Sequence, residues 1–202
     1  ILKTAAGWLG LTADNTGTYT SATTVISAGA FTVAAGNALG NAASTISVTG
    51  AAALAGLPGG AAVNIPQTIV LTSADLTIRG DADVTLSGTF NGVVGGNRRL
   101  ISDVNNSAVV EISGTVNISN DANNRVLYLE DRTFNHATTI SGQIVNGGTS
   151  TAGAVQKEGV GTIVLTNATN SYAGATTVQV GTLRLRNGAL PGNATGNTIV
   201  AA

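Results

Sequence analysis

The fold is decided by the stretch Lys157–Ala194, which reads KEGVGTIVLTNATNSYAGATTVQVGTLRLRNGALPGNA. Three short segments of it are rich in β-branched and aliphatic residues that alternate with a period of two: Thr162–Thr166, Thr176–Val180 and Thr182–Leu185. Gly, Asn and Ala-Gly breaks separate them. Short alternating runs between such breaks are typical of half-buried strands. The stretch therefore predicts three strands joined by tight turns.

A second copy of this stretch lies near the start of the chain, at Lys3–Ala42. The segment from Tyr19 to Val25 aligns with the segment from Tyr172 to Val178, with five identities in seven positions and an offset of 153 residues. Further corresponding pairs are Lys3 and Lys157, Gly7 and Gly161, and, after a gap of one residue, Gly29 and Gly181, Phe31 and Leu183, and Gly40 and Gly192. A string shared over about forty residues indicates an internal repeat.

These residues resemble a known family, the autotransporter-associated β-strand repeat, also called the passenger-associated transport repeat. Its pattern is Lys-x-Gly-x-Gly-Thr-aliphatic-x-Leu, a polar turn with Asn and Tyr, Gly-x-Thr-x-Val, and Gly-Thr-Leu-x-aliphatic. The matching positions are Lys157, Gly159, Gly161, Thr162, Leu165, Tyr172, Gly174, Thr176, Val178, Gly181, Thr182 and Leu183. The first copy departs from the pattern, with Ala5 in place of Gly159, Trp8 in place of Thr162, and Ala30-Phe31 in place of Thr182-Leu183.

The resemblance implies a secreted bacterial surface protein whose passenger is a right-handed parallel β-helix. It covers the two copies and leaves Ala43–Gln156 to be judged on its own pattern. The signal peptide and membrane barrel of the family have no counterpart in the sequence. We therefore expect a portion of a longer chain or one unit of a stacked array.

The composition favours a solenoid over an ordinary globular domain. Charged residues make up 9% and aromatic residues 3% of the chain, against about 25% charged in a typical soluble domain. Side chains this small fill a globular core poorly, whereas a narrow solenoid stacks them rung on rung. No apolar run approaches the roughly 20 residues that span a bilayer, so we expect no membrane span in this segment.

The pattern of short strands continues through the middle of the chain. Thr68–Thr72, Asp75–Arg79 and Asp83–Ser87 follow one another at a spacing of seven or eight residues, and each alternates. Such spacing suits the three faces of a β-helix coil, with roughly 20 to 25 residues per coil and about nine coils. We therefore predict one all-β domain, residues 1–202, that is a right-handed parallel β-helix. Asparagine clusters such as Asn120–Asn124 are expected in turns and ladders between coils.

The inward side chains follow from the alternation. The predicted inward rows contain Ile163 and Leu165, Val178 and Val180, and Leu183 and Leu185. Two segments are predicted to form side loops, Gly95–Arg99 and the charged segment Glu130–His136.

Several classes of function are excluded by charge and residue type. The formal net charge is −1, which provides no basic field for nucleic acid or anionic lipid. The chain has no cysteine, which excludes disulfides, thiolate metal sites and cysteine nucleophiles. No phosphate-binding glycine loop is present, and we predict no cofactor and no metal site.

The candidate catalytic residues are few. His136, the only histidine, stands near Asp131 and Arg132, but nothing marks a nucleophile elbow or an oxyanion loop, so we expect a surface histidine on a charged turn. Asp75, Asp81 and Asp83 with Arg79 would suit a carbohydrate-active groove of the kind that β-helix lyases and glycosidases have. The scarcity of aromatic residues speaks against platforms for sugar rings.

Two short motifs overlap in the same region. Asp81-Ala82-Asp83 is a pair of carboxylates that could ligate Ca²⁺, but the glycine-rich calcium repeat is missing, which favours a solvated turn. Arg79-Gly80-Asp81 is a tripeptide recognised by some host-cell receptors, and a glycine between two strands is equally what a tight turn requires.

We therefore predict a non-enzymatic, extracellular, stiff rod or fibre at a bacterial cell surface, with no catalytic residues. Self-association end to end is expected because neither terminal coil has a charged or proline-bearing edge. Two alternatives stay open. One is an adhesin that binds a host or neighbouring-cell ligand through its side loops, and the other is a carbohydrate-active β-helix enzyme.

Overall fold

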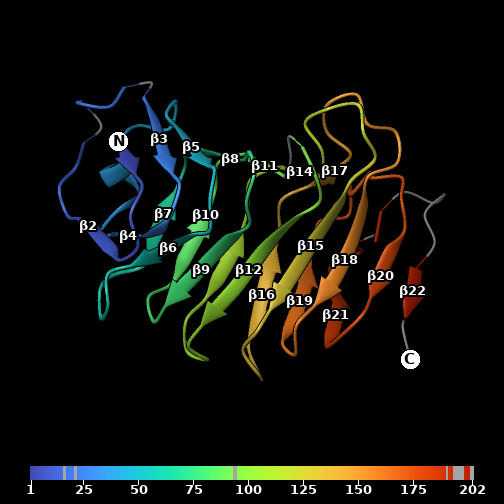
Figure 1. The fold of residues 1–202 in the computed structure, drawn as a ribbon. Coiled ribbons are helices and arrows are strands. Elements are labelled where there is room, and N and C mark those ends of the chain that lie inside the picture. The colour runs from blue at the N-terminus through green and yellow to red at the C-terminus, as the bar shows by residue number, and fades with distance from the viewer. Residues whose placement is uncertain (16, 21, 93–94, 190, 193–197, 201–202) are drawn as a thin grey trace.

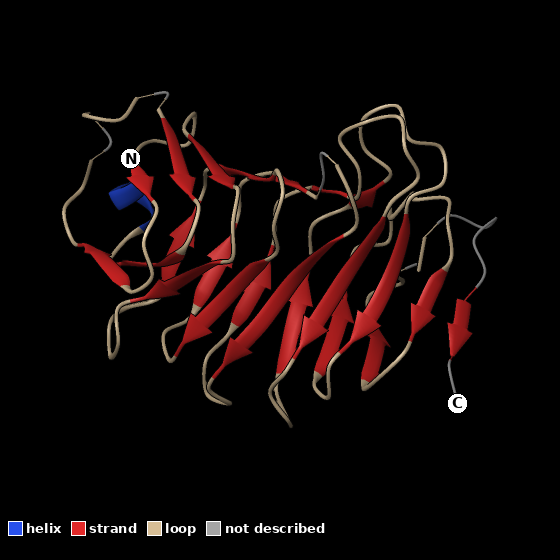
Figure 2. Cartoon of the chain, in the orientation of Figure 1, coloured by secondary structure: helices blue, strands red, loops and turns tan. Residues whose placement is uncertain are grey.

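The computed structural model describes residues 1–15, 17–20, 22–92, 95–189, 191–192 and 198–200. It is a β-solenoid in which the chain winds through three parallel sheets, named here A, B and C (Figure 1). Sheet B contains nine strands, one from each successive coil, so the chain makes about eight turns. Among the described residues the only helix is the short 3-10 helix η1 (Gly36–Leu39), as Figure 2 shows. The prediction of an all-β parallel solenoid is confirmed.

Each sheet collects one strand from successive coils. Sheet A contains β1 (Leu2–Lys3), β3 (Thr23–Ile26), β5 (Thr45–Val48), β8 (Thr68–Leu71), β11 (Phe90–Asn91), β14 (Val116–Asn117) and β17 (Ile144–Val145). Sheet B contains β2 (Trp8–Leu11), β4 (Gly29–Val33), β6 (Ala52–Gly56), β9 (Leu76–Gly80), β12 (Arg98–Val104), β15 (Val126–Asp131), β18 (Ala154–Glu158), β20 (Thr176–Val178) and β22 (Thr198–Val200). Sheet C contains β7 (Val63–Ile65), β10 (Val84–Leu86), β13 (Val110–Ile112), β16 (Ala137–Ile140), β19 (Thr162–Leu165) and β21 (Thr182–Leu185).

The coils vary in length more than the sequence predicts. The shortest register step pairs Thr162 with Thr182, which are 20 residues apart, and the longest pairs Arg98 with Leu127, which are 29 apart. The extra residues lie in loops such as 118–125 and 146–153, which connect sheet A to sheet B. These loops are tied together by Asn124, whose Oδ1 accepts a hydrogen bond from the Ala152 amide at 2.9 Å. The predicted role of this asparagine cluster in inter-coil contacts is confirmed.

The core is a narrow aliphatic column enclosed by the three sheets. Ile163 and Leu165 point into it as predicted, and both are buried. The prediction is wrong for Val180, which is 46% exposed. Leu185 pairs with the inward Leu165, but it is 44% exposed. Val180 lies in the turn after β20, and Leu185 lies on β21, which pairs only with β19 among the described residues. One neighbouring coil is too little to bury Leu185, and Val180 is exposed because it lies in the turn.

The two repeat copies occupy different sheets. β2 and β4 of the first copy belong to sheet B, whereas the corresponding β19 and β21 of the second copy belong to sheet C. In the same way β1 and β3 belong to sheet A, and the corresponding β18 and β20 belong to sheet B. The repeat therefore specifies a strand, a turn and a second strand, and its place in the solenoid is rotated by one sheet between the copies.

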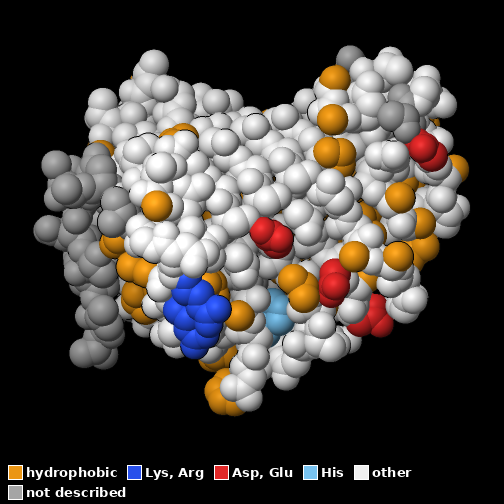
Figure 3. All heavy atoms as spheres, turned by 180° about the vertical axis from the view of Figure 1, so that it is seen from behind, with side chains coloured by type: hydrophobic (Ala, Val, Ile, Leu, Met, Phe, Trp, Pro, Cys, Tyr) orange, Lys and Arg blue, Asp and Glu red, His pale blue; other side chains and the backbone are white. Residues whose placement is uncertain are grey.

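The outer surface carries few charges. Seen from behind, it is mostly uncharged, with a few separate acidic side chains and one basic cluster (Figure 3). Within the described part of the chain, no helix has the length and apolar character needed to cross a membrane.

Candidate functional site

A buried lysine holds the corner where sheet B turns into sheet C. Lys157 lies on β18 with its side chain pointing inward and fully buried. Its Nζ donates hydrogen bonds to the carbonyl oxygens of Gly159 at 2.7 Å and Val180 at 3.1 Å, and also to that of Glu158. Val180 belongs to the equivalent turn of the next coil, so one ammonium group ties two successive turns together.

The glycine beside this ammonium group cannot be replaced without a clash. Gly181 has a φ of +73°, and a Cβ there would come within 2.3 Å of the Gly159 carbonyl oxygen and 2.8 Å of the Lys157 Nζ. The first copy repeats the arrangement, because the Lys3 Nζ donates to the carbonyl oxygens of Ala5 and Ala28 and lies against Gly29. We call each such lysine, with its two turns, a lysine clamp.

A buried ion pair lies directly beneath the second lysine clamp. His136 is 3% exposed, and its Nδ1 lies 2.7 Å from Oδ2 of Asp131 while its Nε2 lies 3.0 Å from the carbonyl oxygen of Ala108. Both partners are acceptors, so both ring nitrogens donate and the ring is an imidazolium. Thr138 also donates to the same carboxylate at 3.0 Å. The expectation that His136 is a surface side chain is wrong, because the preceding coil supplies Ala108 to cover it.

Charge and burial act on the pKa values of this cluster in opposite directions. The hydrogen bond to Asp131 raises the pKa of His136 above its ordinary value, and burial opposes that shift. Burial lowers the pKa of Lys157 to about 8, although the carboxylates of Asp131 and Glu130 favour its charged form. Both ring nitrogens of His136 are occupied by structural partners, which leaves it no nitrogen for activating a serine. The cluster joins coils and is unsuited to general-base catalysis.

The aspartates considered for a carbohydrate-active groove lie at different corners. Asp75 precedes β9 and accepts the Arg99 amide at 2.8 Å, whereas Asp83 precedes β10 and accepts the Val109 amide at 2.7 Å. Each carboxylate thereby binds the backbone of the following coil. No group of three or more His, Cys, Asp or Glu residues that could hold a metal ion occurs in the part of the chain that the structure describes.

The tripeptide Arg79-Gly80-Asp81 is part of the scaffold. Arg79 and Gly80 end β9, Gly80 has a φ of +107°, and the Arg79 Nε pairs with Asp103 at 3.3 Å. The geometry fits the expected turn. The predicted loop Gly95–Arg99 is wrong in its second half, because β12 already begins at Arg98.

A hollow of about 620 Å³ lies on the outer face of sheet B. Its floor follows one aligned row of outward side chains, in which parallel pairing places Trp8 beside Ala30, then Ala53, Thr77 and Ile101. The residues in the middle of the row are small, while the indole of Trp8 at one end is large. The surface of the sheet is therefore lower over the middle of the row than at Trp8. Asp75, Arg79, Asn97 and Arg98 contribute the polar part of the lining.

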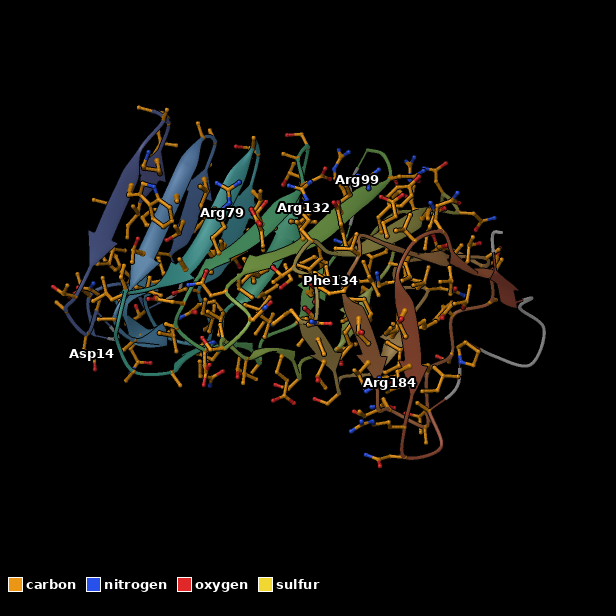
Figure 4. The ribbon with its side chains drawn as sticks, turned by 90° about the horizontal axis from the view of Figure 1, so that it is seen from below. Asp14, Arg79, Arg99, Arg132, Phe134 and Arg184 are labelled. Atoms are coloured by element: carbon orange, nitrogen blue, oxygen red, sulfur yellow. The ribbon has the colours of Figure 1, made fainter. Side chains whose placement is uncertain are left out.

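A charged cluster adjoins the hollow on the same sheet. Arg99 stacks over the Tyr128 ring, with 4.4 Å from its guanidinium carbon to the ring centre, and it pairs with Glu158 and, at 3.5 Å, with Glu130. Arg132 also pairs with Glu130, at 2.6 Å. Figure 4 shows Arg79, Arg99 and Arg132 along the same side of the solenoid. These arginines are neutralised by neighbouring carboxylates.

The comparisons with known proteins agree with the architecture of the second copy. Residues 155–185 match the family model of the passenger-associated-transport-repeat. The match begins on β18 and ends with β21, so the passenger-associated-transport-repeat contains Lys157 and the turns that it ties. Searches of curated proteins and of solved structures each found no match.

The structure gives physical roles to the residues of this repeat. Lys157 is the clamp, Gly181 makes room for it, and Tyr172 fills the core, where its hydroxyl bonds to the Thr176 Oγ1 at 2.6 Å. The lysine spacing was visible in the sequence, but its inward direction was not predicted. The available signal was the alternation within β18, which places Lys157 on the same face as the inward Val155.

The hollow on sheet B was not predicted either. Its floor residues are neighbours only through pairing of strands that are 22 to 24 residues apart. A search for local clusters does not detect such a row, and the register of the coils would have been needed.

Proposed function

We propose that the chain is a stiff, non-enzymatic segment of an extracellular protein on a bacterial surface. The passenger-associated-transport-repeat and the β-solenoid fold fit an autotransporter passenger-like surface protein. The observation that carries the structural role is the lysine clamp, which joins successive coils in both copies. A stack in which each coil is hydrogen-bonded and clamped to the next resists bending and local opening.

The proposal includes end-to-end association of copies. Leu2 and Leu9 on the first coil and Val180 and Leu185 near the other end are exposed apolar side chains. Terminal strands that carry unpaired backbone groups and apolar side chains are templates for pairing with another chain. The supporting observation is therefore the presence of exposed apolar side chains on the outermost coils of the described structure.

Electron microscopy of the purified chain, with its intact mass measured alongside, tests this proposal. We expect filaments with an axial repeat of about 4.8 Å, built from chains with the calculated mass of 19.9 kDa. Isolated short particles at all concentrations would contradict self-association. The surface location is tested separately, by proteinase treatment of intact cells of the source organism followed by detection of the chain.

A ligand-binding adhesin is the second candidate, and the hollow on sheet B favours it. Of the two predicted side loops, Gly95–Arg99 contributes Arg98 to the rim of that hollow. The other, Glu130–His136, is anchored at its ends by the buried pair of Asp131 and His136, and between them it exposes Arg132, Phe134 and Asn135. Turnover of a polysaccharide that is lost in Asp81→Ala would instead support an enzyme.

A further inference from the structure

We propose that the hollow on sheet B binds a carboxylate-bearing polysaccharide, with a sugar ring on Trp8, the chain along the hollow and a carboxylate on Arg98. This inference goes beyond the structural role proposed above and does not depend on it. It rests on the row of outward side chains, on the indole at one end, and on the arginine at the rim.

The exposed indole is the first part of the argument. Trp8 is 59% exposed, and its strand pairing places it in line with Ala30. Ala30 is adjacent to the inward-pointing Phe31, so the row of Trp8 and Ala30 faces outward. An indole on the outer face of a sheet is not buried by coils stacked above or below it. It offers a flat apolar face with a polar N–H, which suits the face of a sugar ring.

The shape of the hollow is the second part. The row from Trp8 to Ile101 crosses five successive strands, and four steps of about 4.8 Å give a length of about 19 Å. Ala30 and Ala53, which are only 5% and 4% exposed, keep the middle of this row low. The volume of about 620 Å³ lies within the range of ligand sites, roughly 300–1,000 Å³. An open trough of this length accommodates several linked sugar rings.

The backbone of the floor argues against a peptide strand as the occupant. β4, β6 and β9 are each paired on both sides within sheet B, so their N–H and C=O groups are already hydrogen-bonded. A peptide that binds by strand addition needs a free sheet edge. A ligand that lies over β4, β6 and β9 must therefore be recognised by stacking and by side chains.

The charges at the rim select an acidic ligand with widely spaced charges. Arg98 has no carboxylate partner among the described residues, and its guanidinium donates only to the carbonyl oxygens of Asn97 and Thr72. Arg79 is paired with Asp103 across an exposed contact of 3.3 Å, which a ligand carboxylate can replace. Asp75 in the same lining opposes a continuous run of negative charge. A chain with a phosphate at every unit is disfavoured, and a polysaccharide with intermittent carboxylates fits.

The test uses the fluorescence of Trp8, which is the only tryptophan in the chain. The full chain is titrated with partly methyl-esterified polygalacturonate, whose remaining carboxylates are intermittent, with its fully methyl-esterified form and with poly-glutamate as a charged polypeptide. We expect the partly esterified polymer to change the emission, and the neutral ester to bind at least about tenfold more weakly, which corresponds to 1.4 kcal/mol. Equal binding of the ester would overturn the carboxylate assignment, and equal binding of poly-glutamate would overturn the assignment to a saccharide.

Two variants and a control locate the site. Thr77→Gln raises the floor of the hollow at a half-buried position, and Arg98→Gln removes the rim charge. We expect each to weaken binding of the partly esterified polygalacturonate at least about tenfold, with filament formation and the unfolding midpoint unchanged. Thr177→Gln places the same side chain on β20 of sheet B, outside the hollow, and is expected to bind as the original chain does. Undiminished binding by both Thr77→Gln and Arg98→Gln would show that the hollow is not the site.

Discussion

At the scale of single residues, the buried lysine of the second clamp is the most consequential side chain. Replacing Lys157 by Met keeps an apolar stem but leaves the carbonyl oxygens of Gly159 and Val180 without their donor. Unsatisfied buried acceptors cost about 1–3 kcal/mol each, so we expect the free energy of unfolding to fall by about 3 kcal/mol. Urea denaturation measures this loss. Arg184→Met, at an exposed position, is the control and should change stability by less than about 0.5 kcal/mol.

The glycine of the clamp gives a second prediction. Gly181→Ala puts a Cβ within 2.3 Å of a carbonyl oxygen at a φ of +73°, and the left-handed conformation alone costs about 1–2 kcal/mol for alanine. We expect a lower thermal unfolding midpoint and faster proteolysis at this corner. Gly10→Ala is the matched control, because a Cβ at Gly10 meets nothing within 4 Å. Similar midpoints for the two variants would show that the corner relaxes freely.

The buried imidazolium predicts a pH dependence of stability. The native pKa of His136 is raised, so its contribution is complete below the unfolded value of about 6.5 and is lost as pH rises through the native value. Lys157 acts in the opposite direction between about 8 and 10.5, where its stabilising contribution grows with pH. We therefore expect the free energy of unfolding to decrease above about pH 6.5 and the decrease to be absent in His136→Gln. NMR titration of the single histidine reports its native pKa directly, and a value below 6.5 would contradict this account.

At the scale of strands and turns, Asp or Asn residues before strands accept amides of the next coil. Asp83 accepts the Val109 amide at 2.7 Å. Replacement by Ala should cost about 1 kcal/mol, the net value of one hydrogen bond, whereas Asn retains an acceptor oxygen and should be nearly neutral. Chemical denaturation of the two variants checks this, and equal losses would mean that the negative charge matters and the acceptor does not.

The same elements show what the sequence could predict. The strands were predictable because alternation such as that of Ile163 and Leu165 is local, and so were the turns marked by Gly and Asn. The burial of His136 could not be predicted, because Ala108, which covers it, comes from the preceding coil, 28 residues away. Leu185 has the right alternation, yet it is exposed because burial requires a coil on each side.

At the scale of the whole molecule, the exposed apolar residues near the ends govern association. Leu185→Lys places a charge on β21, which lies at the end of sheet C, and a charged terminal strand discourages pairing. We expect this variant to form shorter filaments or none, measured by electron microscopy and by size-exclusion chromatography over a range of concentrations. Val109→Lys is the control, since Val109 is also exposed, at 54% against 44% for Leu185, but lies on a side corner. Filaments of unchanged length in Leu185→Lys would exclude β21 from the contact.

The rotation of the two copies by one sheet has a consequence for how such proteins grow. A strand-turn-strand pair that folds equally well in sheets A and B or in sheets B and C is a portable unit. A gene duplication that inserts one more pair lengthens the solenoid without having to restore the original face. Whatever the inserted pair displays is then aimed in a new direction, about a third of a turn away. Length and angular placement of surface features can thus evolve together, one small insertion at a time.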